Sequence, residues 1–274
     1  MRVIAVKLFD SLLSTLDKAS IERTKAYRFR EDAKRMELLE HLYFAYLLQG
    51  VLLEYEIAWT SIQFGATPEN RPFVPNNIPI SDYNVSHDGD YVLIGYTESP
   101  GSRMGVDITR LALPRNTTHE EFFEAFETQM HSTESVNLHA MPSHASKLSR
   151  LLSLWTLKEA YTKALGFGLG FDFSRVAYRF PHDDTAATSS QREQNASANI
   201  AGVTIDGRDL RLGYVTGVLN RWGFFQAHLD GHLVAVSLRD GSEQQYQQQQ
   251  PQEWLSTLHI DQLVNDVLSI NNKL

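Results

Sequence analysis

One long helical segment, followed at once by a glycine-rich stop, constrains the fold of this chain more than any other feature. Apolar residues recur at helical spacing from about residue 146 to residue 165, and the sequence Gly166-Phe167-Gly168-Leu169-Gly170 comes directly after them. Glycine just past the last periodic residue is a frequent stop signal for a helix. Strand-like runs occur on both sides of this segment, so we expect an α+β fold.

The other elements follow from apolar alternation, helical spacing and turn residues. We expect strands at 3–8, 55–64, 82–86, 91–97, 103–108, 173–180, 210–215, 222–229 and 233–238. We expect a helix at 36–53, a helix opened by a capping box of Thr118 and Glu121, and a last helix near 254–268. The polar stretch 182–197 is expected to be a loop, and the glutamine tract at 244–252 to be disordered.

Each half of the chain therefore contains a strand, then helices, then several strands. We expect a pseudo-twofold pair of similar α+β subdomains, residues 1–112 and 113–274, with the Gln-rich segment 243–252 in the second. No sequence repeat proves a duplication. A ligand site between two such units is a common arrangement, so we expect the active site in the cleft between them.

Composition excludes several classes of site and partner. The chain of 274 residues has no cysteine, which excludes disulfides, thiolate zinc sites and cysteine nucleophiles. The N-terminal sequence resembles a strand rather than a signal peptide, and no window is apolar for long enough to span a membrane. The net charge of −8 argues against general nucleic-acid binding. These features predict a cytoplasmic protein.

One short stretch departs from this acidic balance. It contains Arg23, Lys25, Arg28, Arg30, Lys34 and Arg35, diluted by three acidic residues. Such a cluster is usually the solvated face of a helix. The alternative is a site for a phosphate-rich small molecule.

Four short segments carry residues with possible chemical roles. In the long helix, Glu159 and Lys163 are four residues apart and share one face. They could form an ordinary surface salt bridge or lie at the edge of a cleft. Asp107 follows a glycine in a short apolar strand, which is a setting for a magnesium ligand or for a turn cap. Ser86-His87 at a strand end and Arg71-Pro72 are weaker signals.

Taken together and in order, these segments resemble the 4′-phosphopantetheinyl transferases, in particular the larger monomeric type with two fused halves. The resemblance rests on Arg71-Pro72, Ser86-His87, Gly105-Val106-Asp107 and the run Trp155-Thr156-Leu157-Lys158-Glu159-Ala160-Tyr161-Thr162-Lys163. Residues 27–35 are similar to the basic N-terminal segment of that family. The resemblance extends from about residue 25 to residue 172.

The resemblance implies an activity. Enzymes of this family transfer the 4′-phosphopantetheine arm of coenzyme A to a serine of an apo carrier protein, release 3′,5′-ADP and require Mg²⁺. The implied carriers belong to fatty-acid synthases, polyketide synthases, peptide synthetases or aminoadipate reductases. A monomer that binds neither nucleic acid nor a membrane is implied as well.

The resemblance also implies residue roles. Asp107 and Glu159 would hold Mg²⁺, and Glu159 would help to deprotonate the serine. Lys163 and His87 would complete the catalytic set. Coenzyme A would be bound by Arg28, Arg30, Arg71, Ser86, His87, Lys158 and Lys163, and Glu134 would have a supporting role.

One position departs from the pattern. Many bacterial members have a second acid two residues after the aspartate, where this chain has Thr109. A hydroxyl does not replace the charge of a carboxylate, so the third metal position is left to water or another side chain. Two rival functions stay open: a scaffold that kept the fold without catalysis, and another coenzyme-A-dependent enzyme such as an acyltransferase.

Overall fold

We analysed a computed structural model of the chain. The structure describes residues 2–7, 65–67, 71–73, 79–89, 91–167, 170–180, 183, 200, 202–206, 208–210, 221–240 and 255–259. Arg28 and Arg30 lie outside these ranges, as do the expected helix at 36–53, the expected strand at 55–64, the glutamine tract and nearly all of the expected loop at 182–197.

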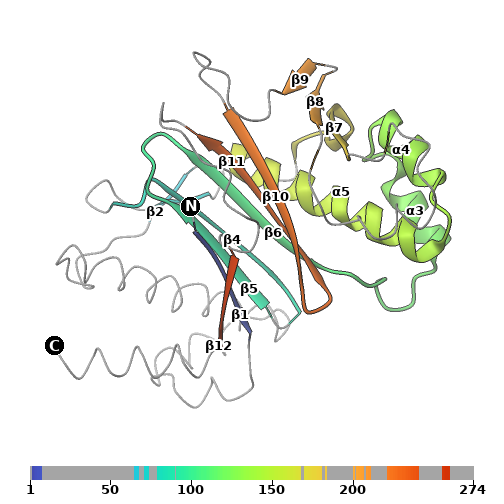
Figure 1. The fold of residues 1–274 in the computed structure, drawn as a ribbon, viewed down its shortest axis with the longest axis horizontal. Coiled ribbons are helices and arrows are strands. Elements are labelled where there is room, and N and C mark those ends of the chain that lie inside the picture. The colour runs from blue at the N-terminus through green and yellow to red at the C-terminus, as the bar shows by residue number, and fades with distance from the viewer. Residues whose placement is uncertain are drawn as a thin grey trace.

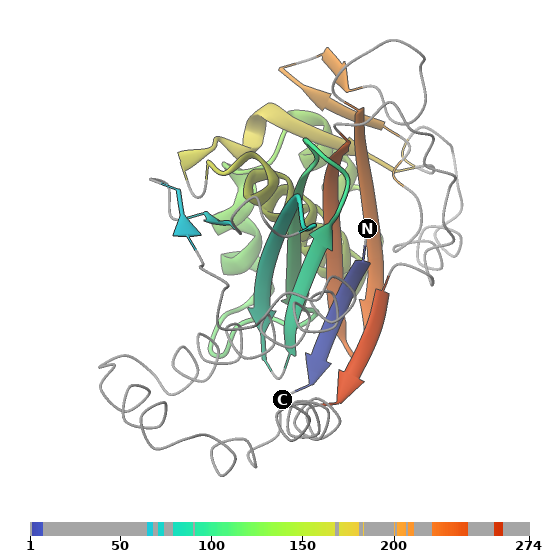
Figure 2. The same cartoon turned by 90° about the vertical axis from the view of Figure 1, so that its left-hand side faces the viewer.

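Two sheets carry the described fold (Figure 1). The first has the order β12-β1-β5-β4 and is built from β1 (Arg2–Lys7), β4 (Asp82–Asp88), β5 (Tyr91–Thr97) and β12 (Leu255–His259). Strand β1 pairs antiparallel with β5 and parallel with β12. Figure 2 shows β1 and β12 side by side, so segments from both ends of the chain complete this sheet.

The second sheet has the order β10-β11-β6 and is fully antiparallel. Its strands are β6 (Arg103–Arg110), β10 (Arg221–Leu229) and β11 (His232–Asp240). Alternation of apolar residues along β6 and β11 buries Val106, Ile108, Val234 and Val236 in one cluster. Strand β6 thus lies before residue 112 and pairs with a strand from the second half of the chain.

Polar side chains, rather than main-chain pairing, connect β4 to β6. Every second residue of β4 accepts a hydrogen bond from the N–H of a residue 22 positions later, on the edge of β6 that does not pair with β11. We call this row the polar ladder. Its pairs are Asp82 with Met104 (2.6 Å), Asn84 with Val106 (2.8 Å), Ser86 with Ile108 (3.3 Å) and Asp88 with Arg110 (2.5 Å). The ladder satisfies β6 amides that would otherwise be buried without partners, and it fixes β4 against β6.

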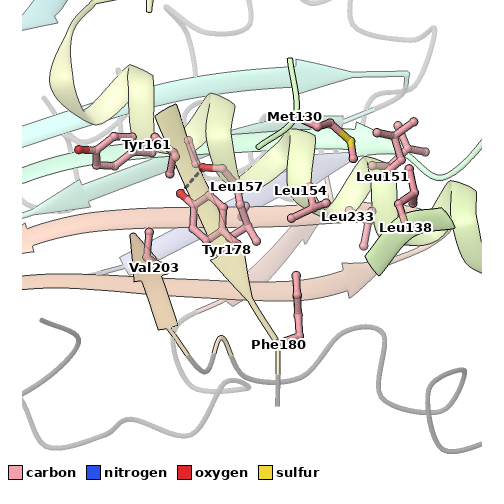
Figure 3. Close-up of a cluster of buried hydrophobic side chains, with 14 of the residues drawn as sticks. Met130, Leu138, Leu151, Leu154, Leu157, Tyr161, Tyr178, Phe180, Val203 and Leu233 are labelled. Atoms are coloured by element: carbon pink, nitrogen blue, oxygen red, sulfur yellow. Dashed lines mark hydrogen bonds between the residues drawn. The ribbon is translucent and has the colours of Figure 1, made fainter. Parts of the chain in front are cut away.

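Helix α5 (His144–Leu165) packs on the second sheet and carries the apolar core of this part of the chain. Ser143 caps its N-terminus, and Gly166 ends it in the left-handed conformation at a φ of 79°. Figure 3 shows Leu151, Leu154 and Leu157 of this helix beside Tyr178, Phe180 and Leu233. The helix is buried on most of its circumference, so its polar residues need specific partners.

Smaller elements surround α5. Helices α3 (His119–Glu127) and α4 (Ser132–His139) lie near its N-terminal half in Figure 1. A short helix η4 (Phe173–Arg175) leads into a separate small sheet, which contains β7 (Val176–Arg179), β8 (Gly202–Ile205) and β9 (Arg208–Leu210). A hairpin-like pair of β2 (Gly65–Ala66) and β3 (Pro72–Phe73) precedes β4. Within the described residues, no helix combines the length and apolar character needed to cross a membrane.

The structure confirms the α+β class and most described elements. The long helix and its glycine stop are found, and Thr118 and Glu121 form the expected capping box of α3. The expected last helix is wrong over Leu255–His259, which form β12. An open edge of β1 takes up this segment as a parallel strand, and pairing with a distant segment overrides local helical spacing. The pseudo-twofold relation and the division near residue 112 stay predictions.

Candidate active site

Three side chains from three different elements converge beside the polar ladder. Lys163 Nζ lies 2.6 Å from Asp107 Oδ1 and 2.9 Å from Ser86 Oγ, and Ser86 Oγ lies 2.8 Å from the same carboxylate oxygen. Ser86 belongs to β4, Asp107 to β6 and Lys163 to the last turn of α5. The Asp107 and Ser86 side chains are buried, whereas Lys163 is partly exposed. The expected juxtaposition of these distant segments is therefore present.

Gly105 is what allows α5 to come this close to β6. A Cβ atom built on Gly105 would lie 1.9 Å from the main-chain oxygen of Ala160 and 2.4 Å from the main-chain nitrogen of Ala164. Because both atoms are helix backbone, no side-chain movement can make room. The glycine of the Gly105-Val106-Asp107 segment thus sets the distance between the Asp107 strand and the Lys163 helix.

Substituting Gly105 tests this close approach. We expect Gly105→Ala to destabilise the protein by about 1–3 kcal/mol, because the helix must move away from the strand. It should also lower activity by separating Lys163 from Asp107. Denaturant unfolding measures the first effect. Gly170→Ala is the matched control, since a Cβ atom there meets nothing within 4 Å. Equal stability of the two variants would contradict the proposed packing role.

Glu159 lies one helical turn before Lys163 on the same face of α5. Burial raises the pKa of its carboxyl, the negative charge of Asp107 raises it further, and Lys163 opposes both effects. Among the described residues, the Glu159 carboxylate has no hydrogen-bond or ion-pair partner. The negative charges of Glu159 and Asp107 therefore repel each other, and Lys163 is the cation that compensates both. Two acids with one compensating lysine favour the binding of a further cation.

Thr109 supports Asp107 from the other side. Its hydroxyl donates a hydrogen bond to Asp107 Oδ2 at 3.1 Å. Thr109 thus holds the carboxylate in place but adds no negative charge to the site.

His87 lies beyond Ser86 on β4 and is exposed. Partial desolvation lowers the pKa of its imidazole, and the positive charge of Lys163 lowers it further, whereas Asp88 and Asp107 oppose these effects. The ring is therefore largely neutral at neutral pH and can accept or donate one hydrogen bond at the edge of the site.

The His87 titration can be measured directly. We expect a midpoint below the ordinary value of 6.5, so the unfolded chain binds more protons than the folded one between the two values. This contribution to folding stability is therefore complete above pH 6.5 and falls as the pH drops through that window. NMR titration of the ring protons, assigned with His87→Gln, gives the midpoint. A midpoint at or above 6.5 would mean that Asp88 and Asp107 outweigh burial and Lys163 at this ring, against the expected direction.

The donor set of the site fits Mg²⁺. The described residues contain no group of three or more His, Asp or Glu side chains that could hold a metal. Mg²⁺ in enzymes is commonly held by one or two carboxylates together with waters and substrate phosphates. Glu159, with its raised pKa and no described partner, and Asp107 supply two hard oxygen donors of this kind.

Lys158 lies on a different side of α5 from Lys163. Its ammonium is buried and donates to Glu134 Oε2 at 2.5 Å and to the main-chain oxygens of Phe173 (3.0 Å) and Gln129 (3.2 Å). Burial raises the pKa of Glu134 and lowers that of Lys158, and the opposite charge of each partner counteracts the shift. The structure thus places the expected phosphate-binding Lys158 in a buried ion pair, away from Asp107, because all three of its ammonium contacts are internal.

Glu134 anchors this ion pair to three elements. Its Oε1 accepts the Tyr178 N–H at 2.7 Å, and its Oε2 accepts the His131 N–H at 3.1 Å. These contacts link the start of α4 to β7 and, through Lys158, to α5. The supporting role expected for Glu134 is therefore a structural one in the described contacts. Helix α4 itself was not anticipated from the sequence.

Comparisons with known proteins identify the family that the chain resembles. Residues 103–215 match the family model described as the 4′-phosphopantetheinyl transferase superfamily, and residues 5–98 match the model described as 4′-phosphopantetheinyl transferase, N-terminal. The 4′-phosphopantetheinyl transferase pptA of Paxillus involutus is 32% identical over 182 residues, which are 62% of this chain and 67% of that protein.

Two further comparisons differ in weight. The L-aminoadipate-semialdehyde dehydrogenase-phosphopantetheinyl transferase of Rattus norvegicus is 28% identical over 231 residues, covering 82% of this chain and 68% of that protein. The chain thus spans about two thirds of the length of both relatives. A holo-(acyl-carrier-protein) synthase structure from Bacillus anthracis in complex with CoA is 16% identical, covers 51% of this chain and 96% of that chain, and has a TM-score of 0.31. A likeness at that level supports no inference.

Proposed function

Because the chain belongs to the 4′-phosphopantetheinyl transferase superfamily, a class of coenzyme-A-dependent transferases, we propose that it modifies a serine of an apo carrier protein. The bond formed joins the serine oxygen to the β-phosphorus of coenzyme A. The bond broken is the one to the bridging pyrophosphate oxygen, so 3′,5′-ADP leaves with the electron pair. The product is the holo carrier.

The observation that carries this proposal is the convergence of Asp107, Glu159 and Lys163 beside the polar ladder. Negative charge accumulates on the diphosphate as the reaction proceeds, and a preorganised cation site stabilises it. Asp107 and Glu159 would hold Mg²⁺, which supplies Lewis-acid stabilisation of the phosphate oxygens when bound.

The remaining steps fall to side chains of this chain. Glu159, whose pKa burial raises, is a stronger base than an exposed carboxylate and accepts the proton of the attacking serine, directly or through one water. Lys163 is the partly exposed cation of the site and donates to a phosphate oxygen. His87, exposed at the rim, donates a second hydrogen bond. Arg28 and Arg30, outside the described residues, are proposed to bind the 3′-phosphate.

The proposal also covers the carrier protein, the oligomeric state and the cellular compartment. The name of the Rattus norvegicus relative points to aminoadipate-semialdehyde dehydrogenase, so a carrier domain of that type is the first to be tested. Carriers of fatty-acid, polyketide and peptide synthases follow. Both carboxylates of the site come from one chain, which supports a monomer, and the absence of cysteine agrees with the cytoplasm.

A panel of apo carriers incubated with the protein, coenzyme A and Mg²⁺ tests the function. Mass spectrometry should show the gain of one phosphopantetheine group on at least one carrier, and chromatography should show an equal amount of 3′,5′-ADP. Release of free coenzyme A instead would indicate an acyltransferase. No modification of any carrier would favour a scaffold that has lost catalysis.

A further inference from the structure

Arg71 lies just before β3, and its buried guanidinium contacts three separate elements. Nη2 donates to Asp82 Oδ2 of β4 at 2.5 Å and to the main-chain oxygen of Met104 of β6 at 2.8 Å. Nη1 donates to the main-chain oxygen of Lys163 in the last turn of α5. The side chain is 8% exposed. Arg71 therefore joins the two strands of the polar ladder to the helix that carries Glu159 and Lys163.

Most of the donors of Arg71 are used inside the protein. A guanidinium has five N–H donors, two on each terminal nitrogen and one on Nε. Both donors of Nη2 and one of Nη1 have partners, and Nε is buried without a partner among the described residues. At most one terminal donor remains for a ligand. Bidentate binding of a phosphate by Arg71 would require the internal contacts to break.

Asp82 is the second member of this arrangement. Its Oδ2 accepts both the Arg71 guanidinium and the Met104 N–H of the ladder's first pair. Burial raises the pKa of this carboxyl, and the positive charge of Arg71 counteracts the shift. A buried carboxylate of this kind depends on its partner, because removing one member of a buried ion pair leaves an uncompensated charge and is strongly destabilising.

The contact between Arg71 and the Lys163 carbonyl connects Arg71 to the candidate active site. Carbonyls in the last turn of a helix lack the usual partner one turn later. The Lys163 oxygen accepts the N–H of the cap residue Gly166 at 3.2 Å and, in addition, the Arg71 guanidinium. The same residue places its ammonium 2.6 Å from Asp107. A shift of this turn therefore moves the Lys163 ammonium, and with it the Glu159 side chain one turn earlier, relative to the Asp107 strand.

We propose that Arg71 and Asp82 are positioning residues that hold the C-terminal turn of α5 against β4 and β6, and that the Arg71 guanidinium is not a bidentate ligand of the nucleotide phosphates. This inference rests on the proposed transferase function. It narrows the expected contact of Arg71 with coenzyme A, because most of its donors are used inside the protein. In this arrangement, Arg71 affects the chemical step through Lys163 and Glu159, while cofactor affinity depends mainly on other residues.

The test separates turnover from cofactor affinity in four variants. Arg71→Met removes the guanidinium, and Arg71→Lys keeps a charge without the planar fork. Asp82→Asn keeps an acceptor for the Met104 N–H but removes the charge that pairs with Arg71. Arg103→Met is the matched control, because Arg103 is 3.8 Å from the other Asp82 oxygen with its side chain 51% exposed. The measurements are kcat, KM, and the Kd of coenzyme A by calorimetry without carrier.

We expect Arg71→Met and Asp82→Asn to lower kcat about tenfold to a hundredfold, since small misplacements of reacting groups have effects of that size. The Kd of coenzyme A should stay within about threefold of the wild-type value, Arg71→Lys should recover part of kcat, and Arg103→Met should match the wild type. A merely structural role would lower thermal stability while leaving kcat per folded molecule unchanged.

Three results would overturn the inference: a Kd raised tenfold or more with kcat unchanged in Arg71→Met, a wild-type kcat in Asp82→Asn, or a loss in Arg103→Met equal to that in Asp82→Asn. If Arg71→Met does not fold, Asp82→Asn decides, because it preserves the ladder contact. An inactive wild type with every carrier would instead reject the proposed function, so the two failures are distinguishable.

Discussion

Glu159→Gln is expected to lower turnover about a hundredfold or more, the size of loss seen when one preorganised charge partner is removed. The amide keeps the shape of the side chain but can neither accept the serine proton nor give a metal ion a full negative charge. Folding stability should not fall, because burial and Asp107 already disfavour the charge on Glu159. A coupled assay with apo carrier measures turnover, and thermal unfolding measures stability.

Asp107→Asn should have an activity loss of similar size, because the amide leaves the Lys163 ammonium without its anionic partner. Glu124→Gln is the matched control, since Glu124 is exposed on α3, which lies near the N-terminal half of α5, whereas Lys163 is in the last turn of that helix. Near-normal rates for Glu159→Gln or Asp107→Asn would reject the assignment of these carboxylates. A loss in Glu124→Gln would show that the assay does not report on the site.

The second large effect is expected for Lys158→Met, which should destabilise the protein by about 3–5 kcal/mol. The substitution leaves Glu134 charged and buried without its cationic partner, although the Tyr178 and His131 N–H groups still donate to it. Denaturant unfolding gives the change in free energy. Any molecules that remain folded should bind coenzyme A normally, because Lys158 contacts only protein groups in the described structure.

The double variant Lys158→Met with Glu134→Gln is the control for this prediction. It removes both charges of the buried ion pair, while the glutamine oxygen can still accept the Tyr178 N–H, so most of the lost stability should return. The opposite pattern, an unchanged unfolding free energy and a weaker affinity for coenzyme A in Lys158→Met, would show that Lys158 faces the cofactor as expected from the resemblance.

The order of the motifs in the sequence was enough to predict that Ser86, Asp107, Glu159 and Lys163 belong to one site. Each of these residues is on an element whose type and length the apolar pattern indicates, and the family resemblance relates the elements to one another. The role of Gly105 was also accessible, because a glycine within an apolar strand often marks a close backbone approach. The structure shows that the backbone approaching Gly105 is that of α5, at Ala160 and Ala164.

The contacts of the Lys158 and Arg71 side chains could not be predicted in the same way. Both are basic residues within or beside family motifs, and a basic residue near a phosphate site has two possible partners: the ligand or a buried acid. Only the three-dimensional structure shows that Lys158 forms an ion pair with Glu134 and that Arg71 forms one with Asp82. Strand β12 escaped prediction for a related reason, since its partner β1 lies about 250 residues away in the chain.

The polar ladder did have a signal in the sequence. Asp82, Asn84, Ser86 and Asp88 alternate with other residues, which places their side chains on one face of a strand. Four polar residues at alternate positions of a mostly buried strand predict hydrogen-bond partners within the protein. The pattern does not say which strand supplies those partners, and β6 is identified only by the constant spacing of 22 residues in the structure.

We propose that Asp107 and Glu159 jointly hold a divalent cation at the diphosphate of coenzyme A. Titration of the protein with Mn²⁺ as a paramagnetic substitute for Mg²⁺, followed by EPR with and without coenzyme A, measures this directly. We predict one tight site that strengthens when coenzyme A is present and is lost in both Asp107→Asn and Glu159→Gln. Retention of that site with unchanged affinity in the two variants would contradict the account.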